Sequence, residues 1–240
     1  MILITRPKDQ SINLKSQLEK KGYNVYQESF YKFQYLKKQI SYDKNVYYIF
    51  PSIHSVQSLI KNNQISKFRN FNILAIGKKV KKKLRESGCK NFTASTHDSS
   101  SMVKIMSSSD NKRKEYIYLC SNIINEEFFI EAYKKKINIK KKIVYKTIGA
   151  KTLTKKLIES FQHNKISGIV FYSQFSVKIY LKLLAKYKIK HNSKSLEVYC
   201  LSERIAKPLR HKNIDNIHVC KKPNEQSLVS TIKKIHFNDR

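Results

Sequence analysis

A buried strand that continues directly into an amphipathic helix is the feature of this sequence that most restricts its fold. Residues 168–184, GIVFYSQFSVKIYLKLL, form an apolar run that breaks at Ser173-Gln174 and resumes with apolar side chains at helical spacing. Residues 48–60, YIFPSIHSVQSLI, repeat this organisation. We call the junction between such a strand and its helix a corner. Neither of these two corners contains a glycine-rich phosphate loop, a Lys-Ser/Thr pair or a nucleophile elbow, so neither carries a known catalytic motif.

The same alternation of short apolar runs and helix-period segments continues along the chain. We expect strands at residues 2–5, 24–30, 46–50, 72–76, 116–120, 139–148, 168–172, 196–201 and 217–219. We expect helices at residues 10–21, 55–61, 78–87, 99–106, 126–136, 154–163, 175–187, 203–210 and 225–235. Strands that alternate with helices on this scale predict an α/β fold with parallel sheets.

The two corners also indicate an internal duplication. Phe50, Ser52, Ser55 and Val56 recur as Phe171, Ser173, Ser176 and Val177, a shift of 121 residues. Other matched segments are shifted by 115 residues near the start of the chain and by 125 to 126 residues further on. Because the shifts grow slowly and keep one order, we interpret the chain as a unit of roughly 115 residues used twice, as two small parallel-sheet α/β domains.

Composition narrows the class of protein. A chain of 240 residues with 40% hydrophobic residues can bury one large core or two small ones. It contains no apolar run of 18 residues and no signal-like start, so we expect a cytoplasmic protein that does not cross a membrane. The four cysteines form no CxxC pair and the seven histidines show no i,i+4 pairing, which predicts reduced thiols and no metal site.

The net charge of +32 is discounted as a sign of nucleic-acid binding. It arises from 42 lysines and only 7 arginines, in a sequence that is also rich in Ile and Asn. Nucleic-acid binders gather Arg and aromatic residues in a patch. We therefore expect the runs KKVKKKLR (78–85) and YKKKINIKKK (133–142) to be mostly solvated surface, with steering of an acidic substrate as the first alternative and nucleic-acid binding as the second.

Polar corners follow the predicted strands at the edge where parallel sheets bind their ligands. Most of them immediately precede a helix, whose free amides and positive dipole suit carboxylates or phosphates. The alternative is that the serines only cap their helices. The candidate ligand-binding residues are Thr5, Arg6, Ser52, His54, Gly77, Lys78, Ser121, Asn122, Ser173, Gln174, Ser202 and Glu203.

In the order of its motifs, the chain resembles the uroporphyrinogen-III synthases. The segments are ILITRP at the start, then KKGYNVYQESF, IFPSIHSV, LAIGKKVKKKLRESG, IVYKTIG, IVFYSQFSV and CLSERIAKPL. The resemblance implies two small α/β domains joined by a two-stranded linker. The first domain is expected at residues 1–33 with 151–240 and the second at residues 39–138, with linker strands near 27–37 and 139–147.

The resemblance also implies the reaction. Hydroxymethylbilane, a linear tetrapyrrole with eight carboxylates, loses water and closes with inversion of its last ring to uroporphyrinogen III, for haem biosynthesis. No cofactor is implied, and the family's candidate for protonating the departing hydroxyl is Tyr145. Val80 and Ile205 replace threonines, and Pro51 and Ser202 replace a Thr and a Gly, which puts side-chain hydroxyl contacts in doubt. We expect a monomer that binds no nucleic acid and that could receive its substrate from hydroxymethylbilane synthase.

Two other classes of function stay open from the sequence. A non-catalytic two-domain protein that binds small anions, with the linker as a hinge, would share the fold and the polar corners. A nucleic-acid binder would account for the charge, although the excess of Lys over Arg and the dispersed charge count against it.

Overall fold

The computed structural model describes residues 1–96, 99–108, 113–124, 126–190 and 196–237 and divides into two compact units. Unit 1 contains Met1–Lys32 and Ile148–Arg240, and unit 2 contains Phe33–Thr147. The chain therefore passes from one unit to the other within two strands, β3 (Tyr31–Tyr35) and β8 (Ile139–Gly149). None of the helices in the described residues has an apolar stretch long enough to cross a membrane.

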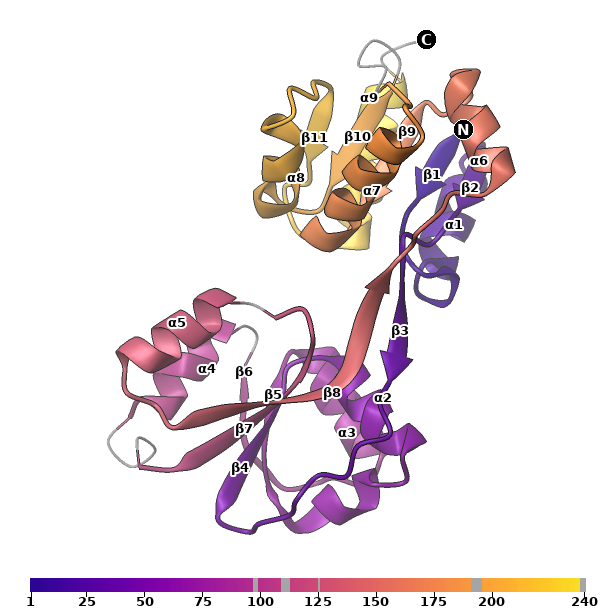
Figure 1. The fold of residues 1–240 in the computed structure, drawn as a ribbon. Helices are drawn as coiled ribbons and strands as arrows, with labels where there is room; N and C mark the ends of the chain where they lie inside the picture. The colour runs from indigo at the N-terminus through magenta and orange to yellow at the C-terminus, as the bar shows by residue number, and fades with distance from the viewer. Residues whose placement is uncertain (97–98, 109–112, 125, 191–195, 238–240) are drawn as a thin grey trace. The chain divides into compact units, whose positions relative to one another are not determined.

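Unit 1 is built on a parallel sheet in the order β11-β10-β9-β1-β2 (Figure 1). The strand β1 pairs with β2 on one side and β9 on the other, so that Leu3 lies opposite both Tyr26 and Ile169. The elements are β1 (Ile2–Ile4), η1 (Lys8–Gln10), α1 (Ile12–Glu19), β2 (Val25–Gln27), α6 (Lys155–Gln162), β9 (Gly168–Phe171), α7 (Gln174–Lys186), β10 (Glu197–Cys200), α8 (Glu203–Arg210), β11 (Ile217–Val219) and α9 (Glu225–Phe237).

Helices cover both faces of this sheet because successive strand residues point to opposite sides. Leu3 and Ile169 face a core with side chains from α6, α7 and α8. Ile4 and Val170, their neighbours in sequence, face a second core with side chains from α1 and α9. A sheet covered on both faces explains why these strands are apolar along their whole length.

Unit 2 contains the second sheet, in the order β3-β8-β7-β4-β5-β6. Strands β7, β4, β5 and β6 are parallel to their neighbours, and β8 is parallel to β7. One face packs against α2 and α3 and the other against α4 and α5. The remaining elements are β4 (Val46–Phe50), α2 (Ile53–Lys61), η2 (Ile65–Asn70), β5 (Asn72–Ile76), α3 (Lys78–Glu86), β6 (Phe92–Thr96), α4 (Ser99–Met106), β7 (Glu115–Ser121) and α5 (Glu126–Lys134).

The predicted α/β fold with two parallel sheets is confirmed, while several elements differ from the expectation. The predicted strand 24–30 ends at Gln27, and β3 is a separate strand that falls within the range 27–37 given by the family resemblance for the first linker strand. Strand β6 was not predicted because its residues, FTAST, are mostly small and polar; it pairs along its length with β5. The 3-10 helices η1 and η2 were also not predicted. The internal duplication stays a prediction.

Candidate functional site

In unit 2 the polar corners lie at the carboxyl edge of neighbouring strands. Ser52 follows β4, Gly77 follows β5, and Ser121 ends β7. Because β7, β4 and β5 are adjacent and parallel, these three corners lie at one edge of the sheet. Strand β8, next to β7, carries Tyr145 opposite Ser121. Four of the candidate residues predicted from the sequence therefore lie at a common edge of this sheet: Ser52, Gly77, Ser121 and Tyr145.

Ser52 has two roles in this corner. Its backbone is extended, with φ −152° and ψ 151°, and its Oγ caps α2 by accepting a hydrogen bond from the His54 N–H at 3.1 Å. The same side chain also forms a hydrogen bond with the Tyr145 phenol. The cap predicted as the alternative role of this serine is therefore present, together with a contact that the local sequence did not reveal.

Tyr145 is a buried phenol, with 6% of its surface exposed. Its ring lies 6.0 Å from the Phe33 ring in an edge-on arrangement and 5.7 Å from the His54 ring. Burial raises the pKa of Tyr145 above its usual value of 10.0, and the hydrogen bond from Ser52 offsets part of that rise by stabilising the phenolate. The phenol is therefore protonated at neutral pH and has a partner for its oxygen when the proton leaves.

Two aromatic residues that the sequence analysis did not single out complete this cluster. The ring of Phe33 stacks on His54 with centroids 3.5 Å apart, and the Tyr35 hydroxyl lies 3.0 Å from His54 Nδ1. Both residues are on β3, where the alternating sequence YKFQY directs Tyr31, Phe33 and Tyr35 to one side. This period of two was the available signal, but residues 31–35 were assigned to a linker strand from the family resemblance alone, without use of their alternation.

The remaining unit 2 candidates hold the backbone in place. Gly77 has φ 94°, a conformation that favours glycine, and it precedes the first residue of α3, the exposed Lys78. Asn122 Oδ1 accepts a hydrogen bond from the Thr147 N–H at 2.8 Å, and the Ser121 hydroxyl lies 3.0 Å from the Thr147 hydroxyl. Ser121 and Asn122 thus tie the end of β7 to β8.

In unit 1, Thr5 and Arg6 make contacts inside the protein. The buried Thr5 hydroxyl donates to the Val170 carbonyl at 2.8 Å. The Arg6 Nε donates to Gln10 Oε1 at 3.0 Å, and the guanidinium lies 4.6 Å from the centre of the Tyr172 ring. Its Nη1 is also 3.7 Å from a carboxylate oxygen of Glu225. Thr5 therefore joins β1 to β9, and Arg6 is held at the edge of the sheet by three neighbours.

The corner before α7 repeats the arrangement seen at Ser52. Ser173 has φ −153° and ψ 150°, and its Oγ caps α7 by accepting from the Ser176 N–H at 3.1 Å. The Tyr31 hydroxyl forms a hydrogen bond with Ser173, and burial raises the pKa of Tyr31. In both units a tyrosine hydroxyl thus meets the capping serine of a helix that follows a parallel strand.

The other unit 1 candidates lie on α7 and α8. Gln174 Nε2 donates to the Arg204 carbonyl at 2.7 Å, which joins the starts of the two helices. Ser202 precedes α8 with an extended backbone, but its side chain does not cap the helix. Glu203 accepts a hydrogen bond from Arg210 Nε at 2.8 Å on an exposed face. The Glu203 carboxylate is therefore compensated within the helix.

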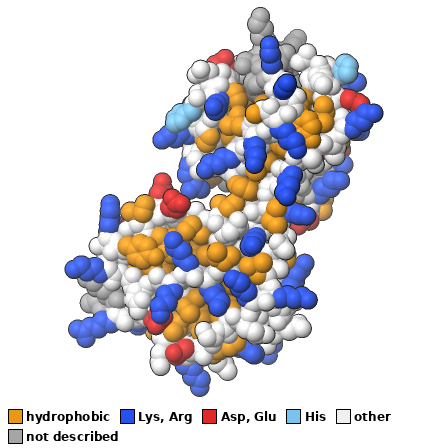
Figure 2. Space-filling model, in the orientation of Figure 1, with side chains coloured by type: hydrophobic (Ala, Val, Ile, Leu, Met, Phe, Trp, Pro, Cys, Tyr) orange, Lys and Arg blue, Asp and Glu red, His pale blue; other side chains and the backbone are white. Residues whose placement is uncertain are grey.

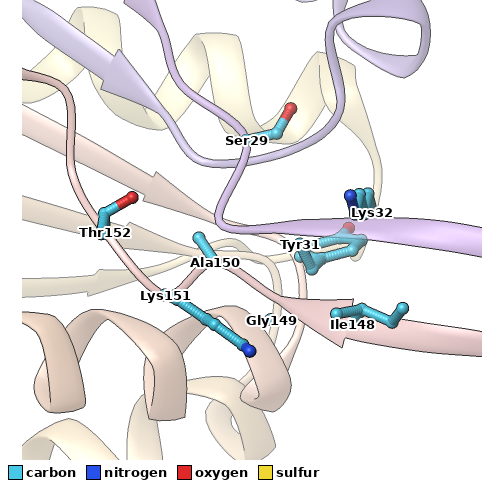
Figure 3. A pocket seen from close by; sticks show the side chains of 8 residues that line it. All are labelled: Ser29, Tyr31, Lys32, Ile148, Gly149, Ala150, Lys151 and Thr152. Atoms are coloured by element: carbon cyan, nitrogen blue, oxygen red, sulfur yellow. The ribbon is translucent and has the colours of Figure 1, made fainter.

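Unit 1 also contains a cavity of about 610 Å³ beside Tyr31 (Figure 3). Figure 3 shows Lys32 and Lys151 on the two chain segments that bound it, with Gly149 between Ile148 and Ala150. A Cβ on Gly149 would lie 2.2 Å from Ile179 Cδ1, so the absence of a side chain lets β8 pack against α7. The eight lining residues are Ser29, Tyr31, Lys32, Ile148, Gly149, Ala150, Lys151 and Thr152.

The two positions at which an apolar residue replaces a threonine of the family also lie in apolar surroundings in the structure. Val80 is 5% exposed in the core beneath α3, and Ile205 is 6% exposed in the core beneath α8. Their side chains offer no polar contact at the starts of these helices. Any anion held there is therefore held by backbone amides or by other side chains.

Known proteins resemble this chain over nearly its whole length. The family model described as uroporphyrinogen-III synthase HemD matches residues 12–230. The uroporphyrinogen-III synthetase of Helicobacter pylori has a similar fold, with a TM-score of 0.66 and 15% identity over 98% of each chain. A mutant uroporphyrinogen III synthase of the extremely thermophilic bacterium Thermus thermophilus gives a TM-score of 0.61 and 10% identity, over 99% of this chain and 98% of that one. No curated protein matches significantly.

Proposed function

This chain belongs to the uroporphyrinogen-III synthase family, and from that premise we propose how its own residues close hydroxymethylbilane to uroporphyrinogen III. In the terms of reaction classes, the proposed enzyme is a cyclising hydro-lyase. The observation that carries the proposal is the Tyr145 phenol, buried and protonated, in contact with the Ser52 hydroxyl at the carboxyl edge of a parallel sheet.

We propose that Tyr145 is the general acid for the loss of water. The phenol donates its proton to the terminal hydroxyl of the substrate and the C–O bond breaks, which gives water, the phenolate and an electrophilic protonated azafulvene (an azafulvenium cation). Ser52 then donates its O–H to the phenolate, while its lone pair keeps the hydrogen bond from the His54 N–H at the start of α2. The positive end of the helix dipole favours the negative charge that develops there.

The later steps need positioning more than further acids or bases. The azafulvene carbon is attacked by the last pyrrole ring, a spiro intermediate forms and rearranges, and the ring closes in the inverted orientation. The proton lost from the pyrrole carbon at the end returns to Tyr145, so that the net change is the loss of one water. Because neither oxidation nor reduction occurs, the proposed reaction balances without a cofactor. We propose that most of the rate enhancement comes from holding the reacting atoms close together in the correct orientation.

The eight carboxylates of the substrate are proposed to bind at the starts of α2, α3, α7 and α8. The amides after Ser52, Gly77, Ser173 and Ser202 are suited to carboxylates because each begins a helix of at least eight residues. Arg6, His54, Lys78, Ser121, Asn122 and Gln174 are proposed to bind through side chains. Thr5 and Glu203 are proposed to contribute through the backbone, because the Thr5 hydroxyl is buried in the sheet and the Glu203 carboxylate would repel those of the substrate.

The setting of the enzyme is also a proposal. The four cysteines are free and buried, which suits a reducing cytoplasm. We propose a monomer that takes hydroxymethylbilane from the enzyme that makes it, because the free substrate closes on its own to the type I isomer. A rapid handover limits that loss.

The isomer composition of the product tests the proposed function. Purified protein is added while hydroxymethylbilane is being generated, and the products are oxidised to porphyrins and separated. We expect the product to change from type I to type III. Unchanged type I product from a preparation that unfolds cooperatively would show that the proposed activity is wrong.

A further inference from the structure

Helix α3 carries an unusual concentration of positive charge. Six of its nine residues are Lys or Arg in the sequence KKVKKKLRE. The apolar side chains Val80 and Leu84 are buried, so the cations occupy the outer faces. Lys78, Lys81, Lys82 and Arg85 fall on one face at helical spacing and, with Glu86, line a shallow groove of about 350 Å³. We call these four residues the basic stripe.

The stripe keeps most of its charge uncompensated. In the part of the chain that the structure describes, no carboxylate forms an ion pair with Lys78, Lys81 or Arg85, and Glu86 is shared between Lys82 at 3.9 Å and Lys83 at 3.5 Å. The Lys81 ammonium and the Arg85 guanidinium lie 5.6 and 5.7 Å from the centre of the Phe92 ring. That ring restrains both side chains without neutralising them.

The stripe also has a definite direction. It begins at Lys78, directly after the Gly77 corner, and ends at Arg85 about 10 Å further along the helix axis, at 1.5 Å per residue. On the face that Figure 2 shows, Lys and Arg side chains are scattered among apolar and polar ones. A line of cations that starts at a candidate carboxylate site differs from this scattered distribution.

We propose that the basic stripe captures the polycarboxylate tetrapyrrole from solution and guides it to the Gly77 corner. This inference rests on the proposed function. Clustered charge raises the local concentration of an oppositely charged ligand and its association rate, and salt weakens both effects. A carboxylate ligand is favoured over nucleic acid because the stripe is short, consists of lysines with one arginine, and has a single aromatic ring that faces the cations rather than open solvent.

The test compares two variants of the full chain that lose the same net charge. Lys82→Gln/Arg85→Gln removes two cations of the stripe, and Lys20→Gln/Lys21→Gln removes two exposed lysines at the end of α1. Association with uroporphyrin III, a stable octacarboxylate, is followed by stopped-flow fluorescence between about 20 and 300 mM salt. The turnover of hydroxymethylbilane is measured in parallel.

We expect the stripe variant to associate roughly 3- to 10-fold more slowly than the wild type at the lowest salt, and less than about 2-fold more slowly at the highest. In turnover, the stripe variant should have a lower kcat/KM and an unchanged kcat. The α1 variant stays within about 2-fold of the wild type throughout, since it loses the same charge away from the stripe.

Equal rates and equal salt dependence for the two variants would overturn the proposal. Binding to double-stranded DNA is measured for both variants as well, and a loss of DNA binding in the stripe variant with unchanged porphyrin association would also overturn it. The outcome is separable from that of the proposed function. A wild type that gives type III product while its stripe variant behaves like the control refutes the stripe alone. A wild type that gives only type I product refutes the activity, whatever the porphyrin association shows.

Discussion

Replacement of Tyr145 by Phe removes the proposed acid while leaving its packing in place. The Phe33 and His54 rings contact the aromatic ring of Tyr145, and Phe supplies the same ring. The Ser52 Oγ loses the phenol but keeps the His54 N–H at 3.1 Å. One buried hydrogen bond between neutral groups is lost, so we expect the free energy of unfolding to fall by only about 1 kcal/mol.

The effect on turnover should be much larger. General acid catalysis contributes roughly 10²- to 10⁴-fold, which corresponds to about 2.7–5.4 kcal/mol of transition-state free energy at 1.36 kcal/mol per tenfold. The assay is the initial rate of type III formation at saturating hydroxymethylbilane, with the type I isomer as the measure of uncatalysed closure. We expect Tyr145→Phe to lower kcat by at least about 100-fold and to raise the type I fraction.

A matched variant separates the lost proton from a general effect of removing a buried hydroxyl. Tyr116 is 1% exposed in the core beneath α4 and α5, on the other face of the same sheet. Tyr116→Phe should retain kcat within about 2-fold, because that phenol is not part of the proposed chemistry. A Tyr145→Phe protein that melts like the wild type and turns over at the wild-type rate would refute the assignment of Tyr145.

Three further perturbations follow from the same contacts. Gly149→Ala places a methyl group 2.2 Å from Ile179 Cδ1, so the free energy of unfolding should fall by about 1–3 kcal/mol in urea titrations; an unchanged midpoint would contradict the packing. Ser52→Ala removes both the α2 cap and the phenolate's partner, so it should cost about 1 kcal/mol of stability and lower kcat. Thr154→Ala uncaps α6 and also removes a hydrogen bond to Glu28, so it should cost at least as much stability at unchanged kcat; equal kcat in the two would argue against Ser52. Burial raises the folded-state pKa of Tyr145, so the folded state holds the phenol proton more tightly than the unfolded state does. The contribution of this phenol to stability is therefore full below about pH 10 and is lost as the pH rises through the folded pKa. In Tyr145→Phe, the free energy of unfolding measured at alkaline pH should lose this part of its pH dependence.

The sequence was sufficient to predict the architecture because apolar runs typical of buried strands clearly alternate with apolar residues at helical spacing. Strand β9 and helix α7 were both predicted within two residues at each end, and the parallel sheets followed from the alternation. Strand β6 was not found because an edge strand of small polar residues carries little apolar periodicity. Strand β3 has a period of two, but it was expected only from the family resemblance, as part of a linker strand near 27–37, because the strand predicted from apolar residues ended at residue 30.

The local sequence could place the candidate residues at corners, but it could not determine what their side chains contact. Ser52 was read as a helix cap or a carboxylate holder, and its contact with Tyr145 depends on β8, which is distant along the chain. Thr5 was chosen as a polar residue after a strand, yet its hydroxyl donates to Val170 within the sheet. Such partners are set by strand order, which neither propensity nor spacing reveals.

The most direct test of the account is the rate of type III formation as a function of the concentration of this protein, at a fixed supply of hydroxymethylbilane. The account predicts that the type III rate rises in proportion to the protein until all substrate is captured, while type I falls by the same amount. A type III rate that stays at the uncatalysed background over the whole range, with folded protein present, would contradict it.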